Sequence, residues 1–400
     1  MLKVVSSEDA LNMVKTQFDF LKAQKENVSI SDCLGRILSE DIFSMENIPA
    51  FNRSTVDGYA VKASNTFGSS ESSPAQLRVI GEVLMGEKTE IELYEDECVK
   101  ISTGGMLPSG ADSVVMVENT DCSFPEYCLV QKAVSPFENV TKKGDDIKEK
   151  DIVLKKGKAI TSREIGILAA LGINQISVAK KIKVGIISTG DEIVPIDSEI
   201  QFGQIRDINT HILSSLVKEL GCDSTEYGII KDAYDSILTA LKTAVNENDI
   251  VLISGGSSAG IRDMTADIIS SLGEVYFHGI AIKPGKPTIL GKIQNTVVFG
   301  LPGHPMAAYF VALKYVKPLI DKIFCKEPTE KIIKGILTQN ISSNHGREEI
   351  VCVKISGDKV QPYFGKSGVI SLLSKSDGYI IIDRNLEGLK QGDEVQVFLF

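Results

Sequence analysis

The stretch Ser254–Asp263, with the sequence SGGSSAGIRD, combines glycines, hydroxyls and a carboxylate, the groups that an anion-binding turn uses. The apolar run Ile250–Ile253 comes just before it, and Thr265–Ile269 has the composition of a helix. A strand, a glycine-rich turn and a helix, in that order, form the ligand sites of doubly wound α/β domains. Glycine lets a ligand approach the backbone, and the free N–H groups of the turn and the helix start attract phosphate. The stretch therefore predicts an anion site.

The glycine spacing does not match either of the common nucleotide-binding loops. Gly255, Gly256 and Gly260 miss the dinucleotide fingerprint, and Ile261-Arg262 stand where a P-loop has Lys-Ser or Lys-Thr. A simple glycine turn with Asp263 as a helix cap is the alternative interpretation. This motif alone leaves both interpretations open.

Three more polar loops follow apolar runs that have the character of strands. Their sequences are STGDE at 188–192, KPGKP at 283–287 and GLPGHP at 300–305. In an open α/β sheet the ligand binds at the carboxyl ends of the strands, so we expect all four loops to meet at one edge. Lys283 and Lys286 lie in one short proline-flanked loop, which favours a binding role over a merely solvated pair of side chains.

Two polar loops lie earlier in the chain. The segment 54–61 carries Asp57 next to a glycine turn signal, and the segment 102–112 carries Thr103 within a Gly/Pro-rich stretch. A solvated surface turn is the alternative interpretation for the first loop. The second loop is longer than a tight turn between strands requires.

The elements that position these loops predict an α/β plus all-β, multidomain fold. Apolar strands alternate with amphipathic helices from Ile182 to about Phe324, as in a mostly parallel, doubly wound sheet. Short β-rich runs predict a small inserted β domain and a C-terminal β-barrel or sandwich. The remaining segments are expected to form one elongated helical part, with a helix over 8–25 and a capping box at Thr161–Glu164. The predicted domains are 1–48 (elongated helical domain, first segment), 49–137 (inserted β domain), 138–178 (elongated domain, second segment), 179–326 (α/β domain) and 327–400 (β-barrel domain).

Composition excludes several classes of protein. The formal net charge of −10 disfavours non-specific nucleic-acid binding, which needs basic surface. No apolar run approaches the roughly 20 residues that span a bilayer, and the N-terminus lacks the long apolar stretch of a signal peptide, so a cytoplasmic location is expected. Seven cysteines with scattered spacing argue against a zinc site or a disulfide framework.

The full set of motifs, in this order, resembles the molybdopterin molybdenumtransferase family (MoeA and the E domain of gephyrin). The resemblance covers nearly the whole chain and implies a similar layout, with a molybdopterin-binding α/β domain and a C-terminal β-barrel. It also implies an elongated homodimer whose active site lies between subunits, with the Asp57 loop facing the α/β domain of the other subunit.

The reaction that the resemblance implies joins molybdate to adenylylated molybdopterin and releases AMP, with a divalent cation, usually Mg²⁺. Such chemistry needs lysines and backbone N–H groups for phosphate and molybdate, and carboxylates for the cation. By motif position, the implied catalytic residues are Asp57, Glu192, Asp263, Lys283 and Lys286, and the implied metal ligands are Asp57, Asp146 and Glu192. The implied binding residues are Thr103, Ser188, Thr189, Gly190, Gly255, Gly256, Ser257, Gly260, Pro302, Gly303, Pro305, Arg347 and Ser367.

The chain departs from the family pattern at four positions. Thr141, Ser257, His304 and Ala307 stand where the family usually has Arg, Val, Asn and Ser. The loss of Arg and Ser donors leaves tungstate open as an alternative to molybdate. A carrier or scaffold that binds molybdopterin without inserting metal is a second hypothesis, and an enzyme of the wider superfamily with another nucleotide substrate is a third. The complete set of acidic residues and both lysines favours the transferase.

Overall fold

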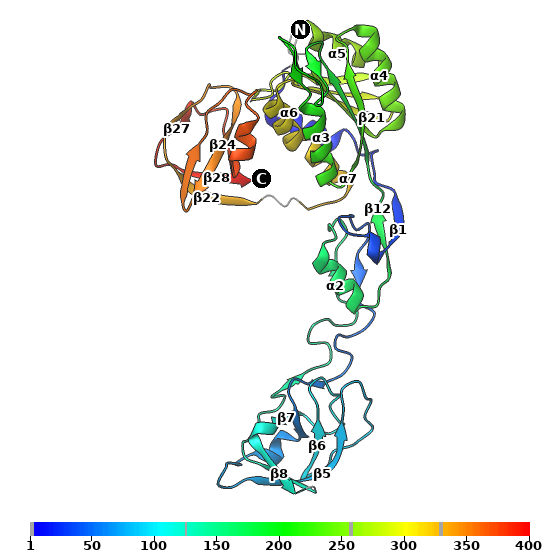
Figure 1. Ribbon diagram of the computed structural model, residues 1–400, viewed down its shortest axis with the longest axis vertical. Helices are drawn as coiled ribbons and strands as arrows, with labels where there is room; N and C mark the ends of the chain where they lie inside the picture. Colours follow the sequence, from blue (N-terminus) through cyan, green and yellow to red (C-terminus); the bar gives the residue numbers. More distant parts are fainter. Residues whose placement is uncertain (1–3, 125, 256–258, 328–330) are drawn as a thin grey trace. The chain divides into compact units, whose positions relative to one another are not determined.

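The computed structural model describes the whole chain except residues 1–3, 125, 256–258 and 328–330, and the side chains of 259–262. The chain divides into two compact units (Figure 1). The larger unit consists of residues 1–40, 156–161 and 175–400, and the smaller unit of 41–155 and 162–174. Within the described residues, no helix has both the length and the apolar character needed to cross a membrane.

A six-stranded sheet forms the centre of the larger unit. The strand order is β16 (Asp223–Ile230), β13 (Lys183–Thr189), β17 (Ile250–Gly255), β21 (Thr296–Leu301), β20 (Ile289–Ile293) and β18 (Glu274–His278). The first four strands are parallel, and β20 runs antiparallel to both of its neighbours. The predicted, mostly parallel sheet is thus confirmed. Strand β18 ends at His278, and β19 (Ile282–Lys283), just before the lysine loop, pairs with a strand of the C-terminal domain instead of the central sheet.

Helices cover both faces of this sheet. Helices α3 (Asn209–Glu219) and α6 (Pro305–Val311) pack on one face, and α4 (Tyr234–Glu247) and α5 (Ala259–Leu272) pack on the other. Buried apolar residues on both sides of the strands explain this layering, because a parallel sheet must bury both faces. The helix that starts with α6 continues through the π-helical segment η4 (Ala312–Val316) into α7 (Lys317–Ile323).

The N-terminal segment joins the larger unit by a helix and a strand. Helix α1 (Ser7–Thr16) ends at Thr16, so the helix predicted over 8–25 is too long, and Ser6 caps its start. Helix α1 packs against α7, and strand β1 (Lys25–Ser29) pairs antiparallel with β12 (Gln175–Ala179). The turn η1 spans Ile30–Asp32.

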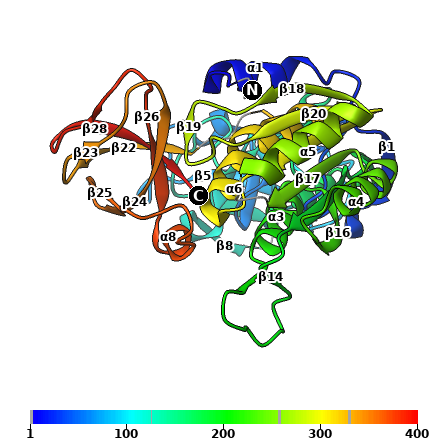
Figure 2. The ribbon, with the colours of Figure 1, turned by 90° about the horizontal axis from the view of Figure 1, so that it is seen from above.

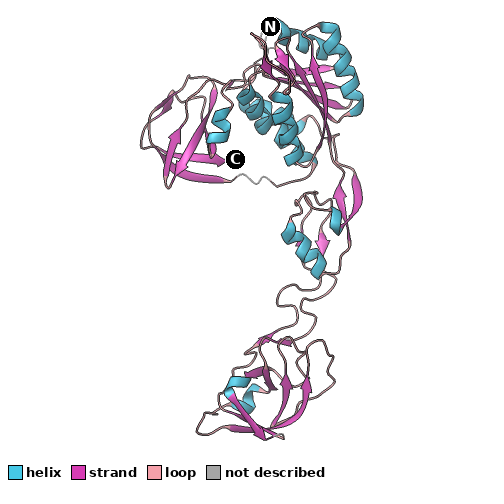
Figure 3. Cartoon of the chain, in the orientation of Figure 1, coloured by secondary structure: helices cyan, strands magenta, loops and turns pink. Residues whose placement is uncertain are grey.

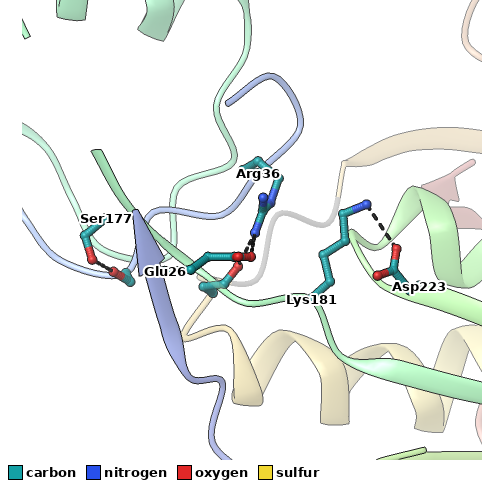
Figure 4. A network of polar contacts seen from close by, with 7 residues as sticks. Glu26, Arg36, Ser177, Lys181 and Asp223 are labelled. Carbon is teal, nitrogen blue, oxygen red and sulfur yellow. Dashed lines mark hydrogen bonds and ion pairs between the residues drawn. The ribbon is translucent and has the colours of Figure 1, made fainter. Parts of the chain in front are cut away.

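A network of polar contacts fixes the base of the β1–β12 ribbon (Figure 4). The Arg36 guanidinium pairs with the Glu26 carboxylate and donates to the Ala179 carbonyl oxygen at 3.0 Å. Lys181 pairs with Asp223 at 3.0 Å. These contacts tie the ribbon to the start of the α/β sheet, because Asp223 is the first residue of β16.

Strands dominate the smaller unit (Figure 3). Its main sheet has the order β7 (Ser113–Met116), β4 (Gly58–Val61), β6 (Glu97–Ile101), β5 (Ala75–Val83), β9 (Tyr127–Val130) and β8 (Thr120–Phe124). The sheet confirms an inserted β domain. Strand β4 follows the polar Asp57 loop and lies fully buried between β6 and β7, so only the first part of the segment 54–61 is a surface loop.

The rest of the smaller unit contains more strand than the predicted helical part suggests. Two short pairs join distant segments: β2 (Ile42–Phe43) with β11 (Ile152–Leu154), and β3 (Arg53–Ser54) with β10 (Val140–Thr141). Helix α2 (Ser162–Ala170) begins at the predicted capping box. Segments on either side of the inserted domain therefore do pair with each other, and the exact domain boundaries stay predictions. The short turns η2 and η3 span Ala63–Thr66 and Val117–Asn119.

The C-terminal part of the larger unit is a closed barrel of five strands (Figure 2). Its strands are β22 (Ile332–Leu337), β24 (Glu348–Ser356), β25 (Lys359–Pro362), β26 (Gly378–Ile382) and β28 (Glu394–Leu399). Pairing of β24 with β26 closes the ring, and the predicted barrel is confirmed. The remaining short elements are β14 (Ile193–Val194), β15 (Ile205–Arg206), β23 (Ile341–Ser342), β27 (Gly388–Leu389) and α8 (Ser371–Lys375).

Candidate functional site

A cavity of about 640 Å³ in the larger unit gathers several of the predicted site residues. It lies between the loops after β18 and β21 and one side of the barrel, and its lining comes from segments 282–287, 302–307, 347–352 and 363–372. Five predicted residues share this cavity: Lys283, Lys286, Pro302, Arg347 and Ser367. These residues come from four separate stretches of the sequence, and the fold brings the four together.

The cavity carries an excess of positive charge. Lys283 forms an ion pair with Glu349 at 2.7 Å, and Glu349, whose side chain is only 12% exposed, also accepts a hydrogen bond from Ser343 Oγ at 2.8 Å. Lys286, Arg347 and Lys366 are exposed and have no ion-pair partner among the residues that the structure describes. Three unpaired cations around one cavity attract an oxyanion, and a guanidinium can hold two of its oxygens at once.

The glycine turn packs against the neighbouring strand end. Gly255 has a φ of +154°, and a Cβ there would lie 2.1 Å from Thr189 Oγ1 and 2.2 Å from the Thr189 carbonyl oxygen. A Cβ on Gly303 would lie 3.6 Å from the carbonyl carbon of Gly255. The ends of β13 and β17 therefore meet with no room for a Cβ at Gly255, and Gly303 after β21 is in ordinary contact with Gly255. Such close backbone packing suits a cradle in which N–H groups face a ligand.

Asn209, which the sequence analysis missed, ties these strand ends together. Its side-chain amide donates to Ser254 Oγ at 2.6 Å and to the Gly303 carbonyl oxygen at 2.8 Å. Its own carbonyl oxygen is buried and has no partner among the described residues. An Asn at the start of a helix is a common capping residue, so its type alone gave no signal of this role.

The predicted residues of the glycine-rich turn fall into two groups. Gly256 and Ser257 lie outside the described residues. Gly260 and Asp263 lie in helix α5, which begins at Ala259. Asp263 is thus the fifth helical residue, so the alternative interpretation of a helix cap is wrong, and its carboxylate is exposed.

Pro305 is the first residue of α6 and does not line the cavity with Pro302.

The first two residues of the motif 188–192 end strand β13 and are buried inside the domain. Ser188 and Thr189 are buried, and Ser188 Oγ donates to Asp207 Oδ1 at 3.2 Å. Asp207 also accepts from the backbone N–H of Thr210 at 3.1 Å. Ser188 therefore orders the start of helix α3, whereas Gly190 lines a second cavity of about 570 Å³ next to this motif.

Asp191 lines this second cavity, and Asp232 contacts Asp191 from just beyond the end of β16. The backbone N–H of Asp232 donates to Asp191 Oδ1 at 3.3 Å, and Oδ1 of Asp232 is buried without a partner among the described residues. Burial raises the pKa of Asp232, and the negative charges of Asp191 and Glu192 add to this rise, while the Thr189 hydroxyl opposes it. The sequence analysis missed Asp232, although it lies just beyond the end of β16 at Ile230.

Asp57 and Thr103 meet in the smaller unit. Asp57 Oδ1 accepts from the backbone N–H of Thr103 at 2.7 Å and from its hydroxyl at 3.0 Å. The backbone N–H of Gly104 donates to the Ser54 carbonyl oxygen at 2.8 Å, so the two polar loops are held side by side. Both Asp57 and Thr103 are exposed, as is Asp146 in the same unit. The two loops thus present one ordered carboxylate on the surface.

We predict that Thr103→Val raises the pKa of Asp57. The two hydrogen bonds from Thr103, first the backbone N–H and then the hydroxyl, lower this pKa below its ordinary value of 3.8. A lowered folded-state pKa gives stability that is present above the ordinary value and lost as the pH falls through the folded-state pKa. The valine removes the hydroxyl alone, so the pKa moves part of the way back. A carboxyl-carbon NMR titration measures it, and an unchanged midpoint in the variant would contradict the assignment.

The predicted metal ligands are not brought together within one unit. Asp57 and Asp146 belong to the smaller unit and Glu192 to the larger one. Across the described ranges, no group of three or more His, Cys, Asp or Glu side chains has the geometry to hold a metal ion.

Comparison with known proteins places this architecture in one family. Residues 5–172 match the family model described as "MoeA N-terminal region (domain I and II)". Residues 185–322 match "Probable molybdopterin binding domain", and residues 334–400 match "MoeA C-terminal region (domain IV)". The three models together cover nearly the whole chain in the family's order.

Relatives and solved structures agree with these models. The chain is 30% identical over 402 residues to the molybdopterin molybdenumtransferase of Staphylococcus epidermidis, which covers 99% of this chain and 95% of the relative. It is 32% identical to the molybdopterin molybdenumtransferase of Haemophilus influenzae, over 94% of this chain and 93% of the relative. A crystal structure of a MoeA protein from Pyrococcus horikoshii matches with a TM-score of 0.85 and 40% identity over 99% of both chains. This chain therefore belongs to the MoeA family of enzymes of molybdenum cofactor biosynthesis.

Proposed function

We propose that this protein inserts molybdate into adenylylated molybdopterin and releases AMP. The observation that carries the proposal is the cavity in which Lys286 and Arg347 stand unpaired, among the described residues, beside the Lys283–Glu349 pair. Molybdate is a tetrahedral dianion, and unpaired cations in a partly enclosed cavity bind such a substrate more strongly than they would on an open surface.

Different residues of the chain bind the molybdate and the phosphate end of molybdopterin. Lys286 and Arg347 hold the molybdate oxygens, and Arg347 uses its planar donor fork. The Lys283–Glu349 pair keeps one lysine at the cavity wall while the barrel strand β24 supports it. Gly255 and the start of helix α5 offer backbone N–H groups to the phosphate end of molybdopterin. Asp263 lies one turn into that helix, on its exposed side.

Magnesium is part of the same proposal, and carboxylates next to β13 would supply its protein ligands. Magnesium is usually bound through one or two carboxylates together with substrate phosphates, so a complete cage of protein ligands is not needed. Glu192 is the ligand that the sequence indicates, and Asp191 and Asp232 add carboxylate oxygens, one of them buried without a described partner. The ion would neutralise phosphate charge when bound.

The proposal also includes the oligomeric state and the location of the protein. We expect a homodimer in which the loop with Asp57 faces the α/β domain of the second subunit, and a cytoplasmic enzyme. The exposed, hydrogen-bonded Asp57 supports this expectation, because an ordered surface carboxylate can bind a cation from outside its own unit.

One assay tests the proposal and its alternatives. The purified protein is incubated with adenylylated molybdopterin and magnesium, with molybdate or tungstate, and AMP release and protein-bound metal are measured. Oxyanion-dependent AMP release with one metal per pterin is the expected result. Tight pterin binding without AMP release would replace the transferase with a carrier. Metal retention with tungstate alone would assign the other oxyanion.

A further inference from the structure

The His304 side chain forms part of the cavity wall and takes no part in capping its helix. It is the residue before helix α6, with φ −73° and ψ 127°, yet it makes no side-chain capping hydrogen bond. Its Nδ1 lies instead 2.8 Å from Ser367 Oγ. The backbone N–H of Met306 also donates to the Ser367 carbonyl oxygen at 3.2 Å. One contact therefore holds the imidazole, and the other holds the start of helix α6 against the loop that carries Ser367.

These contacts leave one ring nitrogen available. Across the described residues, Nε2 of His304 has no hydrogen-bond partner, and the side chain is exposed in a cavity that Lys286 and Arg347 also line. When the Ser367 hydroxyl donates to Nδ1, a neutral imidazole carries its hydrogen on Nε2. An anion in the cavity favours this tautomer, because the anion accepts the Nε2 hydrogen.

We propose that His304 donates a hydrogen bond from Nε2 to the tetrahedral oxyanion substrate and that Ser367 is the positioning residue that presents it. The inference rests on the proposed function, since that function puts the oxyanion in this cavity. A ring donor held by two loops has a fixed direction, whereas the flexible lysines act as point charges. His304 thus adds orientation to a site in which Lys286 and Arg347 supply charge.

A nucleophilic Ser–His pair is the other chemistry that these two side chains suggest, and the geometry argues against it. In such pairs a third group, usually a carboxylate, holds the second ring nitrogen of the histidine. The carboxylate that lines this cavity, Glu349, is already bound by Lys283 and Ser343. Ser367 therefore orients His304 rather than receiving activation from it.

Calorimetric titration of the purified full-length protein with sodium molybdate alone tests the role of His304. We expect His304→Ala to raise the Kd about tenfold, the effect of losing one hydrogen bond to a charged group. His304→Asn should recover part of the affinity, because its amide also donates. His345→Ala is the matched control: this exposed histidine lies in the loop before β24 and outside the cavity lining, so its Kd should not change. An unchanged Kd in folded His304→Ala overturns the inference.

A double-mutant cycle tests whether Ser367 acts through His304. Ser367→Ala alone should raise the Kd about threefold, and it should add nothing in the His304→Ala background. The same loss in both backgrounds would mean that Ser367 contacts the oxyanion directly, and the positioning role would be wrong. Imidazole nitrogen NMR gives a second readout: molybdate should increase the Nε2–H tautomer of His304 in the wild type and fail to do so in Ser367→Ala.

The outcomes separate this inference from the proposed function. Loss of molybdate binding in Lys286→Ala, with normal binding in His304→Ala, would reject the role of His304 and leave the proposed function standing. Absence of binding in the wild type would reject the oxyanion site and the function together. If His304→Ala does not fold, His304→Phe keeps a ring without any hydrogen-bond donor, and a Kd equal to that of the wild type would then overturn the inference.

Discussion

Lys286→Ala is expected to lower molybdate-dependent AMP release on the order of 100- to 1000-fold, the usual cost of removing one preorganised donor from an oxyanion site. Lys286 is exposed in the cavity, and no described residue shares its charge. Its backbone carbonyl oxygen accepts from the Ile280 N–H at 2.9 Å, a contact that alanine keeps. The fold should therefore survive, and activity and thermal unfolding should be measured on the same preparation.

Lys218→Ala is the matched control for this variant. Lys218 is an exposed lysine in the last turn of helix α3, and neither cavity of the site includes it. Lys218→Ala removes one positive charge from the same unit as Lys286→Ala. An effect of net charge alone would therefore appear in both variants. A normal yield of molybdenum cofactor from folded Lys286→Ala would remove the central support of the proposed function.

Gly255→Ala is expected to destabilise the protein by about 3 kcal/mol, the upper part of the range for forcing atoms into a packed site. The added Cβ would lie about 2 Å from two oxygens of Thr189, one of them a backbone oxygen that cannot rotate away. The clash falls where β13 and β17 meet, so the glycine turn must shift and substrate binding should be lost as well. Urea denaturation followed by circular dichroism measures the loss of stability.

Gly203→Ala separates the clash from backbone strain in this experiment. Gly203 has a φ of +91°, also unfavourable for alanine, but no described atom lies within 4 Å of its Cβ position. Strain alone should cost about 1 kcal/mol there. Equal losses in the two variants would show that crowding at Thr189 contributes nothing.

The larger elements could be predicted because their residues follow simple patterns. The buried runs at 183–189, 250–255 and 296–301 have the character of parallel strands, and each became one. Strand β20 was missed: its sequence ILGKI is short and resembles a turn-flanked apolar fragment, and only its partners show that it runs antiparallel. Strand β26 was missed for a similar reason, since its pairing with β24 closes the barrel over a long distance in the chain.

The site could be predicted as a set of motifs but not as a set of contacts. The lysine loop, Arg347 and Ser367 were each identified, and the fold places them in one cavity. The partners of these residues could not be found from sequence. His304 stood out only as a departure from a family pattern, and nothing in its neighbours indicates a bond to a side chain 63 positions away. Long-range polar contacts of this kind leave no periodic signal.

Strand β19 has a consequence for the modular character of this enzyme. Residues Ile282 and Lys283 leave the central sheet and align in parallel with Glu348 and Glu349 of β24. A short backbone segment of the α/β domain thus pairs with a barrel strand, and the loop that carries both lysines connects the α/β domain to the barrel. A gene fragment that ends at residue 327 would encode a complete doubly wound sheet with that loop untethered. Replacing the barrel with another domain would therefore remove Arg347, Ser367 and the Glu349 partner of Lys283 from the anion cavity.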